Sequence, residues 1–97
     1  MEDFIPTAVW NATVQEAQLF GRRLRELRQS RDLTQEALAE AADLSGNYIS
    51  DLELGLKVPS LTIIVRLAQS LDIAASDLLT AFTREAVKKM KLRKHRA

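Results

Sequence analysis

The chain has 97 residues, an apolar fraction of 46%, no cysteine and a formal net charge of +1, which together fit one globular domain. No apolar run approaches the roughly 18 residues that a membrane span needs, and the acidic start (Glu2, Asp3) is unlike a signal peptide. Without cysteine there is neither a disulfide framework nor a thiolate zinc site. We therefore expect a soluble cytoplasmic protein with no membrane partner.

The net charge hides a division between two parts of the chain. Residues 84–97 hold seven Lys or Arg and one acid, Glu85, which gives +6. Residues 1–83 hold seven basic and twelve acidic side chains, which gives −5. This asymmetry is typical of a nucleic-acid-binding tail and also of a solvated helix end. Both interpretations of the tail stay open.

Residues 1–13 are predicted to form an N-terminal arm. The segment FIPTAVW (4–10) is apolar without clear helical spacing, and Pro6 interrupts it. It is either a loosely ordered arm or a segment in which Phe4 or Trp10 fills a groove on this chain or on a partner.

The first predicted helix covers about residues 14–30. Thr13 and Glu16 have the spacing of a capping box. Apolar residues then recur at helical spacing, at Val14, Ala17, Phe20, Leu24 and Leu27. We expect this helix to end near Asp32.

Two short helices are predicted next, at about residues 35–42 and 46–54. Thr34 and Ser45 precede them, and each hydroxyl can accept a backbone N–H that a first helical turn leaves unpaired. Gly55 follows the second helix, where glycine most easily adopts the left-handed conformation that ends a helix. Two capped helices joined by so few residues predict a helix-turn-helix.

Two further helices complete the predicted fold. Pro59 and Ser60 stop the chain and cap a fourth helix, with an apolar stripe at Leu61, Ile64, Val65, Ala68 and Leu71. A fifth helix is predicted from near Ala75 to about residue 90, with apolar residues Leu78, Leu79, Phe82, Ala86 and Met90. No strand pattern occurs, so the predicted fold class is all-α with five helices.

These elements suggest three parts of the chain. Residues 1–13 are the N-terminal arm, 14–83 the helix-turn-helix domain, and 84–97 the end of the fifth helix with the basic tail.

The stretch from about Phe20 to Leu79 resembles the phage-repressor and Cro-type (Xre-like) helix-turn-helix family. Four segments carry the resemblance in the family's order and spacing: FGRRLRELR, LTQEALAEAADLS, YISDLELG and PSLTIIVRLAQSLDI. Within the family, YIS, the acid-containing helix end and PSL are most similar to the small controller proteins of restriction–modification systems. The resemblance implies a phage-repressor-like, DNA-binding domain.

In this family the helix after the turn enters the major groove, and its first residues meet base edges. The resemblance therefore implies base contacts from Asn47, Tyr48, Ser50 and Asp51. Asn47 can make a two-point contact with adenine, and Asp51 can accept a hydrogen bond from cytosine N4. It also implies phosphate contacts from Thr34, Gln35, Ser45, Gly46 and Lys57.

Two departures from the family pattern bear on affinity. The loop LELGLKV has one lysine where relatives often carry two or three basic residues, and Gly46 has no side chain to read a base. Because neutralised phosphates supply much of the affinity for DNA, tight binding is expected of a dimer rather than of a monomer.

The resemblance also implies an ion pair between Arg28 and Glu53, which would join the first helix to the third. On the fifth helix, we assign Leu78 to the core of the monomer, which leaves the apolar side chains of Leu79 and Phe82 without a partner. We expect a homodimer to form there, through Leu79, Phe82 and Ala86.

Catalytic and metal chemistry have little support. The only histidine, His95, lies in the tail, Glu36 and Glu40 lack a third ligand, and no Gly-rich phosphate loop occurs. We expect no enzyme activity, no metal and no cofactor. The leading hypothesis is a sequence-specific transcriptional regulator that binds double-stranded DNA as a homodimer on an inverted-repeat operator. The alternative is an antitoxin or another protein-binding module on the same fold.

Overall fold

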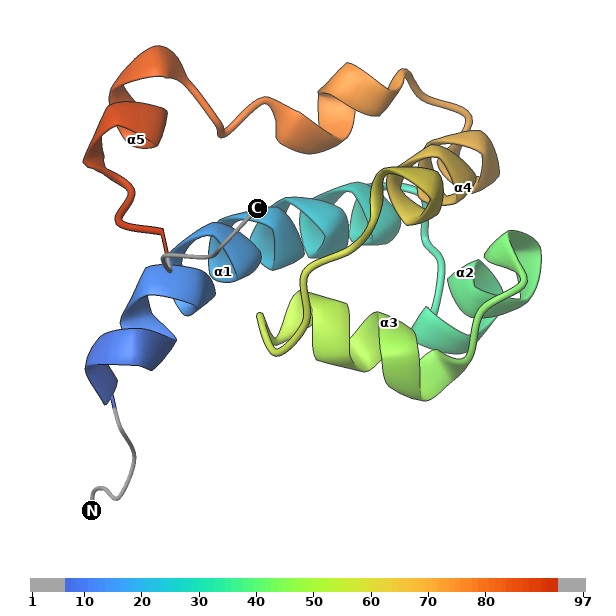
Figure 1. The fold of residues 1–97 in the computed structure, drawn as a ribbon. Helices are drawn as coiled ribbons and strands as arrows, with labels where there is room; N and C mark the ends of the chain where they lie inside the picture. Colours follow the sequence, from blue (N-terminus) through green and yellow to red (C-terminus); the bar gives the residue numbers. More distant parts are fainter. Residues whose placement is uncertain (1–6, 93–97) are drawn as a thin grey trace.

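A computed structural model describes the backbone of residues 7–92 and the side chains of residues 15–92. Its α-helices are α1 (Thr7–Ser30), α2 (Gln35–Ala42), α3 (Gly46–Glu53), α4 (Leu61–Leu71) and α5 (Arg84–Lys89), and a 3₁₀ helix, η1 (Ala75–Leu79), lies between α4 and α5. No strand occurs within the described residues (Figure 1). The all-α prediction is confirmed.

The long helix α1 is the element around which the others are arranged. It packs against α3 on one side and against η1 on another, while α2 packs against both α3 and α4 (Figure 1). Leu78 of η1 is fully buried, as expected. The core combines residues from all these elements: Phe20, Leu24, Leu38, Ala39, Ala42, Ile49, Leu52, Leu67, Ala68, Leu71 and Leu78.

The starts of three helices follow the predicted hydroxyl caps. Thr34 Oγ1 accepts from the Ala37 N–H at 2.9 Å, Ser45 Oγ from Tyr48 at 3.0 Å, and Ser60 Oγ from Ile63 at 3.2 Å. Each cap satisfies one N–H that the first helical turn leaves without a backbone partner. The caps fix the starts of α2, α3 and α4 at the predicted positions.

Three helices end in the same backbone conformation, which the sequence analysis did not predict. An aspartate in the left-handed conformation follows α1, α2 and α4, and the next, apolar residue returns its N–H to a carbonyl five positions back. Asp and Asn tolerate this conformation better than most residues other than glycine. The three pairs are Asp32–Leu33, Asp43–Leu44 and Asp72–Ile73.

Helix α1 begins at Thr7, so its predicted start at residue 14 is wrong. Residues 7–13 contain neither glycine nor proline, and the spacing of Thr13 and Glu16 marks a helix start only where the chain is not already helical. The expected arm therefore overlaps α1. Trp10 belongs to α1, and Phe4 lies outside the described residues.

The predicted fifth helix is also wrong as one continuous element. Its first part is the 3₁₀ helix η1, and α5 starts only at Arg84. Thr83 has an extended backbone (φ −71°, ψ 167°), and its hydroxyl accepts from the Ala86 N–H at 3.1 Å. A threonine that caps α5 must itself leave the helical conformation, so the helix is interrupted at Thr83. The apolar periodicity continues across this break and therefore suggested one continuous helix.

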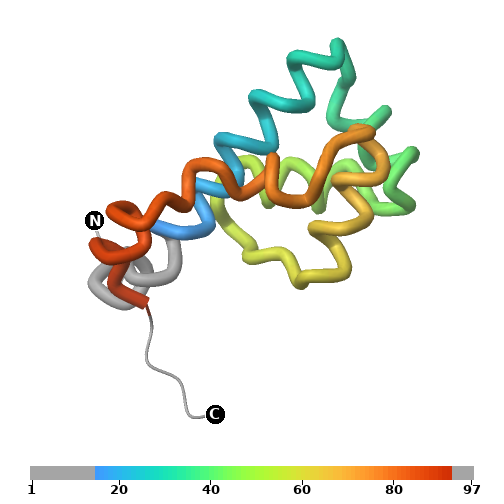
Figure 2. The backbone as a smooth tube through the Cα atoms, turned by 90° about the horizontal axis from the view of Figure 1, so that it is seen from above, coloured from blue at the N-terminus to red at the C-terminus, as the bar shows by residue number. Residues whose placement is uncertain are grey.

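After this break, the chain returns to the N-terminal part of α1. The Lys91 N–H donates to Gln15 Oε1 at 3.3 Å, and Figure 2 shows the segment near the blue part of α1. Residues 93–97 of the predicted basic tail lie outside the described residues.

Two glycines permit the close contact between α1 and the end of α3. A Cβ at Gly21 would lie 2.2 Å from the Leu52 carbonyl oxygen and 2.8 Å from that of Glu53. Gly55 has φ +77°, and a Cβ there would lie 2.7 Å from Gln18 Cγ. The backbone of α3 therefore rests directly on α1, and the position of α3 depends on the absence of a side chain at residue 21.

We predict that Gly21→Ala lowers the free energy of unfolding by about 3 kcal/mol, because backbone atoms cannot yield to the added methyl group. The gain in helix propensity, about 1 kcal/mol, is too small to compensate. Gly46→Ala is the matched control, since its Cβ would make an ordinary contact, 3.5 Å from Glu36 Oε2. Urea unfolding measures the free energy of unfolding of both variants, and equal values would contradict the close-contact explanation.

Candidate nucleic-acid interface

The junction of α2 and α3 is fixed by backbone conformation and by a hydroxyl cap. Asp43 is left-handed (φ 59°), and the Leu44 N–H donates to the Ala39 carbonyl at 2.8 Å. Ser45 then caps α3. The angle between α2 and α3 is thereby set over a layer of buried side chains, Leu38, Ala42, Ile49 and Leu52.

The side chains implied as base contacts lie along α3. Asn47 is exposed, whereas Tyr48, Ser50 and Asp51 are half-buried. Tyr48 packs against the core, and this burial raises the pKa of its hydroxyl above the ordinary value. Like an ordinary tyrosine hydroxyl, it can both donate and accept a hydrogen bond.

Lys57, in the loop after α3, is held over this helix. Its ammonium nitrogen lies 3.6 Å from Asp51 Oδ2 and 5.6 Å from the centroid of the Tyr48 ring. The Lys57 and Asp51 side chains are 54% and 33% exposed, so the pair is accessible to a ligand. We call Tyr48, Asp51 and Lys57 the α3 charge cluster. Sequence reasoning treated these residues as separate DNA contacts and missed their association.

The residues implied as phosphate contacts lie mainly at two helix starts. Thr34 and Gln35 are at the start of α2, and Ser45 and Gly46 at the start of α3. The Glu36 carboxylate lies beside Gly46, where it is favourable for the α3 dipole and unfavourable for a bound phosphate. Glu36 is also in the first turn of α2, so the same carboxylate acts against an anion at both helix starts.

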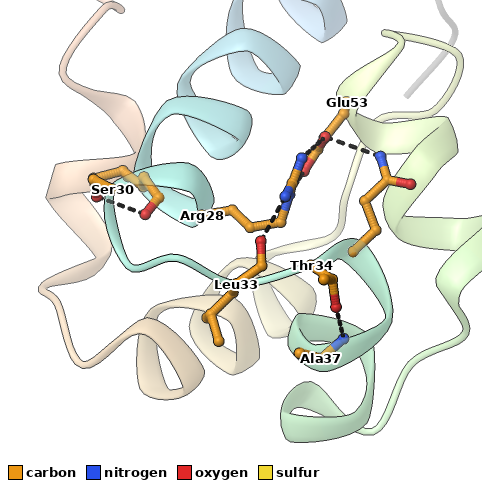
Figure 3. A network of polar contacts seen from close by, with 8 residues as sticks. Arg28, Ser30, Leu33, Thr34, Ala37 and Glu53 are labelled. Carbon is orange, nitrogen blue, oxygen red and sulfur yellow. Dashed lines mark hydrogen bonds and ion pairs between the residues drawn. The ribbon is translucent and has the colours of Figure 1, made fainter.

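The predicted ion pair between Arg28 and Glu53 is present and nearly buried (Figure 3). Arg28 Nε donates to Glu53 Oε2 at 2.6 Å, and Nη2 donates to Oε1 at 3.0 Å. Arg28 Nη1 also donates to the Leu33 carbonyl at 2.6 Å. The side chains of Arg28 and Glu53 are 10% and 4% exposed. Hydrogen bonding to Glu53 raises the pKa of Arg28 above its ordinary value, although desolvation acts in the opposite direction.

Gln35 joins the same network, which sequence reasoning did not anticipate. Its Nε2 donates to Glu53 Oε1 at 3.0 Å. The amide carries two N–H groups, so one can orient the side chain while the other binds a second acceptor. Glu53 thus connects the ends of α1 and α3 with the first residue of α2.

Two of the three residues expected at a dimer seam line a small apolar cavity. Leu79 is 37% exposed, Phe82 is half-buried, and both line the cavity; Ala86 is half-buried on α5. The cavity has a volume of about 180 Å³ and is bounded by Glu16, Ala17, Phe20, Val58, Pro59, Ile64, Leu79 and Phe82. Its lining residues come from α1, from α4 and the loop before it, and from η1 and the segment after it.

Other kinds of site find no support in the described part of the chain. Its side chains include no group of three or more His, Cys, Asp or Glu that could hold a metal ion. No helix among the described residues is long and apolar enough to cross a membrane.

Comparison with known families agrees with this geometry. Residues 19–81, which run from α1 past the end of η1, match the helix-turn-helix domain family. The chain belongs to the helix-turn-helix domain family. The predicted resemblance to Xre-like regulators is confirmed.

Members similar to this chain include regulators and controller proteins. Control protein C.BamHI of Bacillus amyloliquefaciens is 40% identical over 62 residues, 63% of this chain and 76% of that protein. The uncharacterized HTH-type transcriptional regulator YazB of Bacillus subtilis is 38% identical over 63 residues, 65% of this chain and 91% of that protein. The solved structure of the restriction-modification controller protein C.AhdI from Aeromonas hydrophila has a TM-score of 0.64 at 41% identity, covering 65% of this chain and 96% of that one.

These relatives are helix-turn-helix regulators and controller proteins rather than enzymes, in agreement with the expected absence of enzyme activity. The chain is accordingly a transcriptional regulator of the helix-turn-helix type.

We predict that Arg28→Met lowers the free energy of unfolding by about 3–5 kcal/mol, because it leaves the Glu53 carboxylate buried without its principal partner. The control is Arg66→Met, which removes the exposed ion pair of Arg66 with Asp43 at 3.6 Å and costs about 1 kcal/mol or less. Chemical unfolding of both variants provides the comparison. Losses of similar size would mean that the buried pair contributes no more than a surface pair.

Proposed function

We propose that this regulator binds an inverted-repeat operator in a sequence-specific manner, as a homodimer. The observation that carries the proposal is the capped α2–α3 unit, which leaves Asn47 exposed on α3. Gln35 is hydrogen-bonded to the last residue of the same helix, and Lys57 is paired with Asp51 on it. A rigid helix with an exposed polar face, next to a helix start that can bind a phosphate, has the parts needed to read a major groove.

In this proposal the side chains of α3 read base edges. Asn47 makes a two-point contact with adenine, and Asp51 accepts from cytosine N4. Tyr48 packs its ring against a thymine methyl group or gives its hydroxyl to a phosphate, and Ser50 contacts either kind of base. These base contacts depend on the groups that each base edge presents, so they supply specificity more than affinity.

Phosphate contacts come from the starts of α2 and α3 and from the loop that follows. Thr34 and Gln35 sit where the first N–H groups of α2 and its positive dipole end attract an anion. The hydrogen bond from Gln35 to Glu53 supports this role, because it orients the amide before DNA arrives. Lys57, Ser45 and Gly46 complete the proposed set.

The dimer seam is proposed at Leu79, Phe82 and Ala86. The exposure of Leu79 beside an apolar cavity supports it, since a partner's side chain can remove both from water. Two copies double the phosphate contacts of a chain whose residues 1–83 carry a net charge of −5. Similarity to C.BamHI and C.AhdI supports a role as a controller protein of a restriction–modification system.

The function is tested by selecting binding sites from a random duplex library and footprinting the enriched sequences. We expect an inverted repeat whose half-sites are centred about 10–10.5 bp apart, one duplex turn. A single asymmetric site would contradict the dimeric mode. Failure to enrich any sequence at low salt would contradict DNA binding and favour the antitoxin alternative.

We predict that Asn47→Ala lowers affinity for the selected site by about 1–3 kcal/mol and leaves binding to random DNA unchanged, as loss of a base contact does. Gln35→Ala should weaken binding to both kinds of DNA to a similar degree. Its stability is measured first, because it also removes a donor to Glu53. If Asn47→Ala weakens both equally, Asn47 does not read a base.

We predict that Leu79→Glu weakens dimerisation at least tenfold in sedimentation, because a carboxylate at an apolar seam must be desolvated. Leu79 is a better test than Phe82, which also packs against the core. Leu61→Glu is the control: it makes the same change at a more exposed leucine, at the start of α4. If only the Leu61 variant dissociates, the dimer interface lies on α4 and not at Leu79.

A further inference from the structure

The α3 charge cluster joins a carboxylate and an ammonium on the face proposed to meet DNA. Asp51 Oδ2 and Lys57 Nζ are 3.6 Å apart, and the ammonium also lies 5.6 Å from the centroid of the Tyr48 ring. The attraction to the carboxylate and the cation–π contact act on Lys57 from the same helix. In the free protein Lys57 is thus directed toward α3, while about half of its side chain stays exposed (54%).

This arrangement has opposite consequences for the two charges. A free Lys57 would offer three N–H donors to a phosphate, whereas a free Asp51 would be repelled by the same phosphates. When they are paired, the site carries no net charge. Lys57 is also the only basic residue in the loop between α3 and α4, so its engagement decides whether that loop attracts the DNA backbone at all.

Resting on the DNA-binding function proposed above, we propose that Asp51 reduces binding to non-cognate DNA by retaining Lys57 on α3. At a cognate position, a cytosine amino group replaces Lys57 as the partner of Asp51, and Lys57 then moves to a phosphate. Where Asp51 faces a base edge that offers only acceptors, such as guanine O6 and N7, no donor replaces Lys57 and the pair stays closed. Asp51 therefore couples base recognition to a phosphate contact, and is a specificity-determining residue through Lys57.

A simpler effect of Asp51 would be direct repulsion of the DNA backbone, which does not involve Lys57. The two mechanisms differ in their dependence on the lysine. Retention predicts that removing the carboxylate matters only while Lys57 is present, whereas repulsion predicts the same change with or without it. A double-mutant cycle separates them.

The experiment measures binding of the full chain to a random-sequence duplex as a function of salt, for the wild type, Asp51→Asn, Lys57→Met and the double variant. We expect Asp51→Asn to raise random-DNA affinity about two- to fivefold per subunit, the range for an exposed ion pair. Its salt dependence should steepen by up to about 0.9 per subunit, because a released lysine neutralises one more phosphate. The double variant should bind like Lys57→Met.

The charge control is Glu26→Gln, which removes one negative charge from the pair with Arg23 on α1, at 3.4 Å. Arg23 also donates to the Asp77 carbonyl of η1, so this pair lies beside η1 and not on α3. An equal rise for Glu26→Gln would reduce the effect to net charge and overturn the proposal. So would an equal rise from Asp51→Asn in the Lys57→Met background, or no rise at all.

Failure of the proposed function gives a different result. If the wild type binds neither random DNA nor any selected sequence at low salt, DNA binding itself is wrong. If the wild type binds and the cycle is additive, DNA binding stands and only the role of Asp51 is overturned.

Discussion

The Glu53 carboxylate is the group at which the first three helices meet. It lies at the end of α3, accepts two hydrogen bonds from Arg28 of α1 and one from Gln35 of α2, and is almost completely removed from water. A carboxylate in that position must be fully satisfied, because an unpaired buried charge costs several kcal/mol. The same requirement that fixes α3 on α1 therefore also orients the first side chain of α2.

This polar network depends on a backbone contact. Gly21 lets the carbonyl groups of Leu52 and Glu53 rest against α1, which brings Glu53 within reach of Arg28. Gly55 then ends α3 against Gln18 in a left-handed conformation. A larger residue at either position would move the end of α3 away from α1 and lengthen the ion pair. Stability of the domain and placement of the proposed recognition helix thus have one physical origin.

The proposed DNA-reading face has little uncompensated positive charge. Asp51 is paired with Lys57 over Tyr48, and the Glu36 carboxylate lies beside the start of α3. With so few uncompensated positive charges near α3, the proposed DNA binding relies for backbone affinity on helix starts and on the proposed second copy of the chain. A protein built in this way depends on correct base contacts more than one with a strongly basic recognition face.

The sequence by itself determined the features that depend on neighbours a few positions away. Thr34, Ser45 and Ser60 each cap the helix that begins at the next residue, and Gly55 follows the end of α3. The bounds of α2 and α3 and the start of α4 were therefore predicted nearly to the residue. The Arg28–Glu53 pair followed from the family resemblance. The extension of α1 to Thr7 was missed because a capping motif inside a helix looks the same in sequence as one at its start.

Tertiary structure alone decided how those elements meet. The hydrogen bond from Gln35 to Glu53, the pairing of Lys57 with Asp51 and the cavity beside Leu79 follow no local pattern. Gln35 and Glu53 are 18 positions apart, and Arg23 and Asp77 are 54 apart. Periodicity tells which face of a helix is buried but not the angle or offset at which two helices pack, and those set which side chains touch.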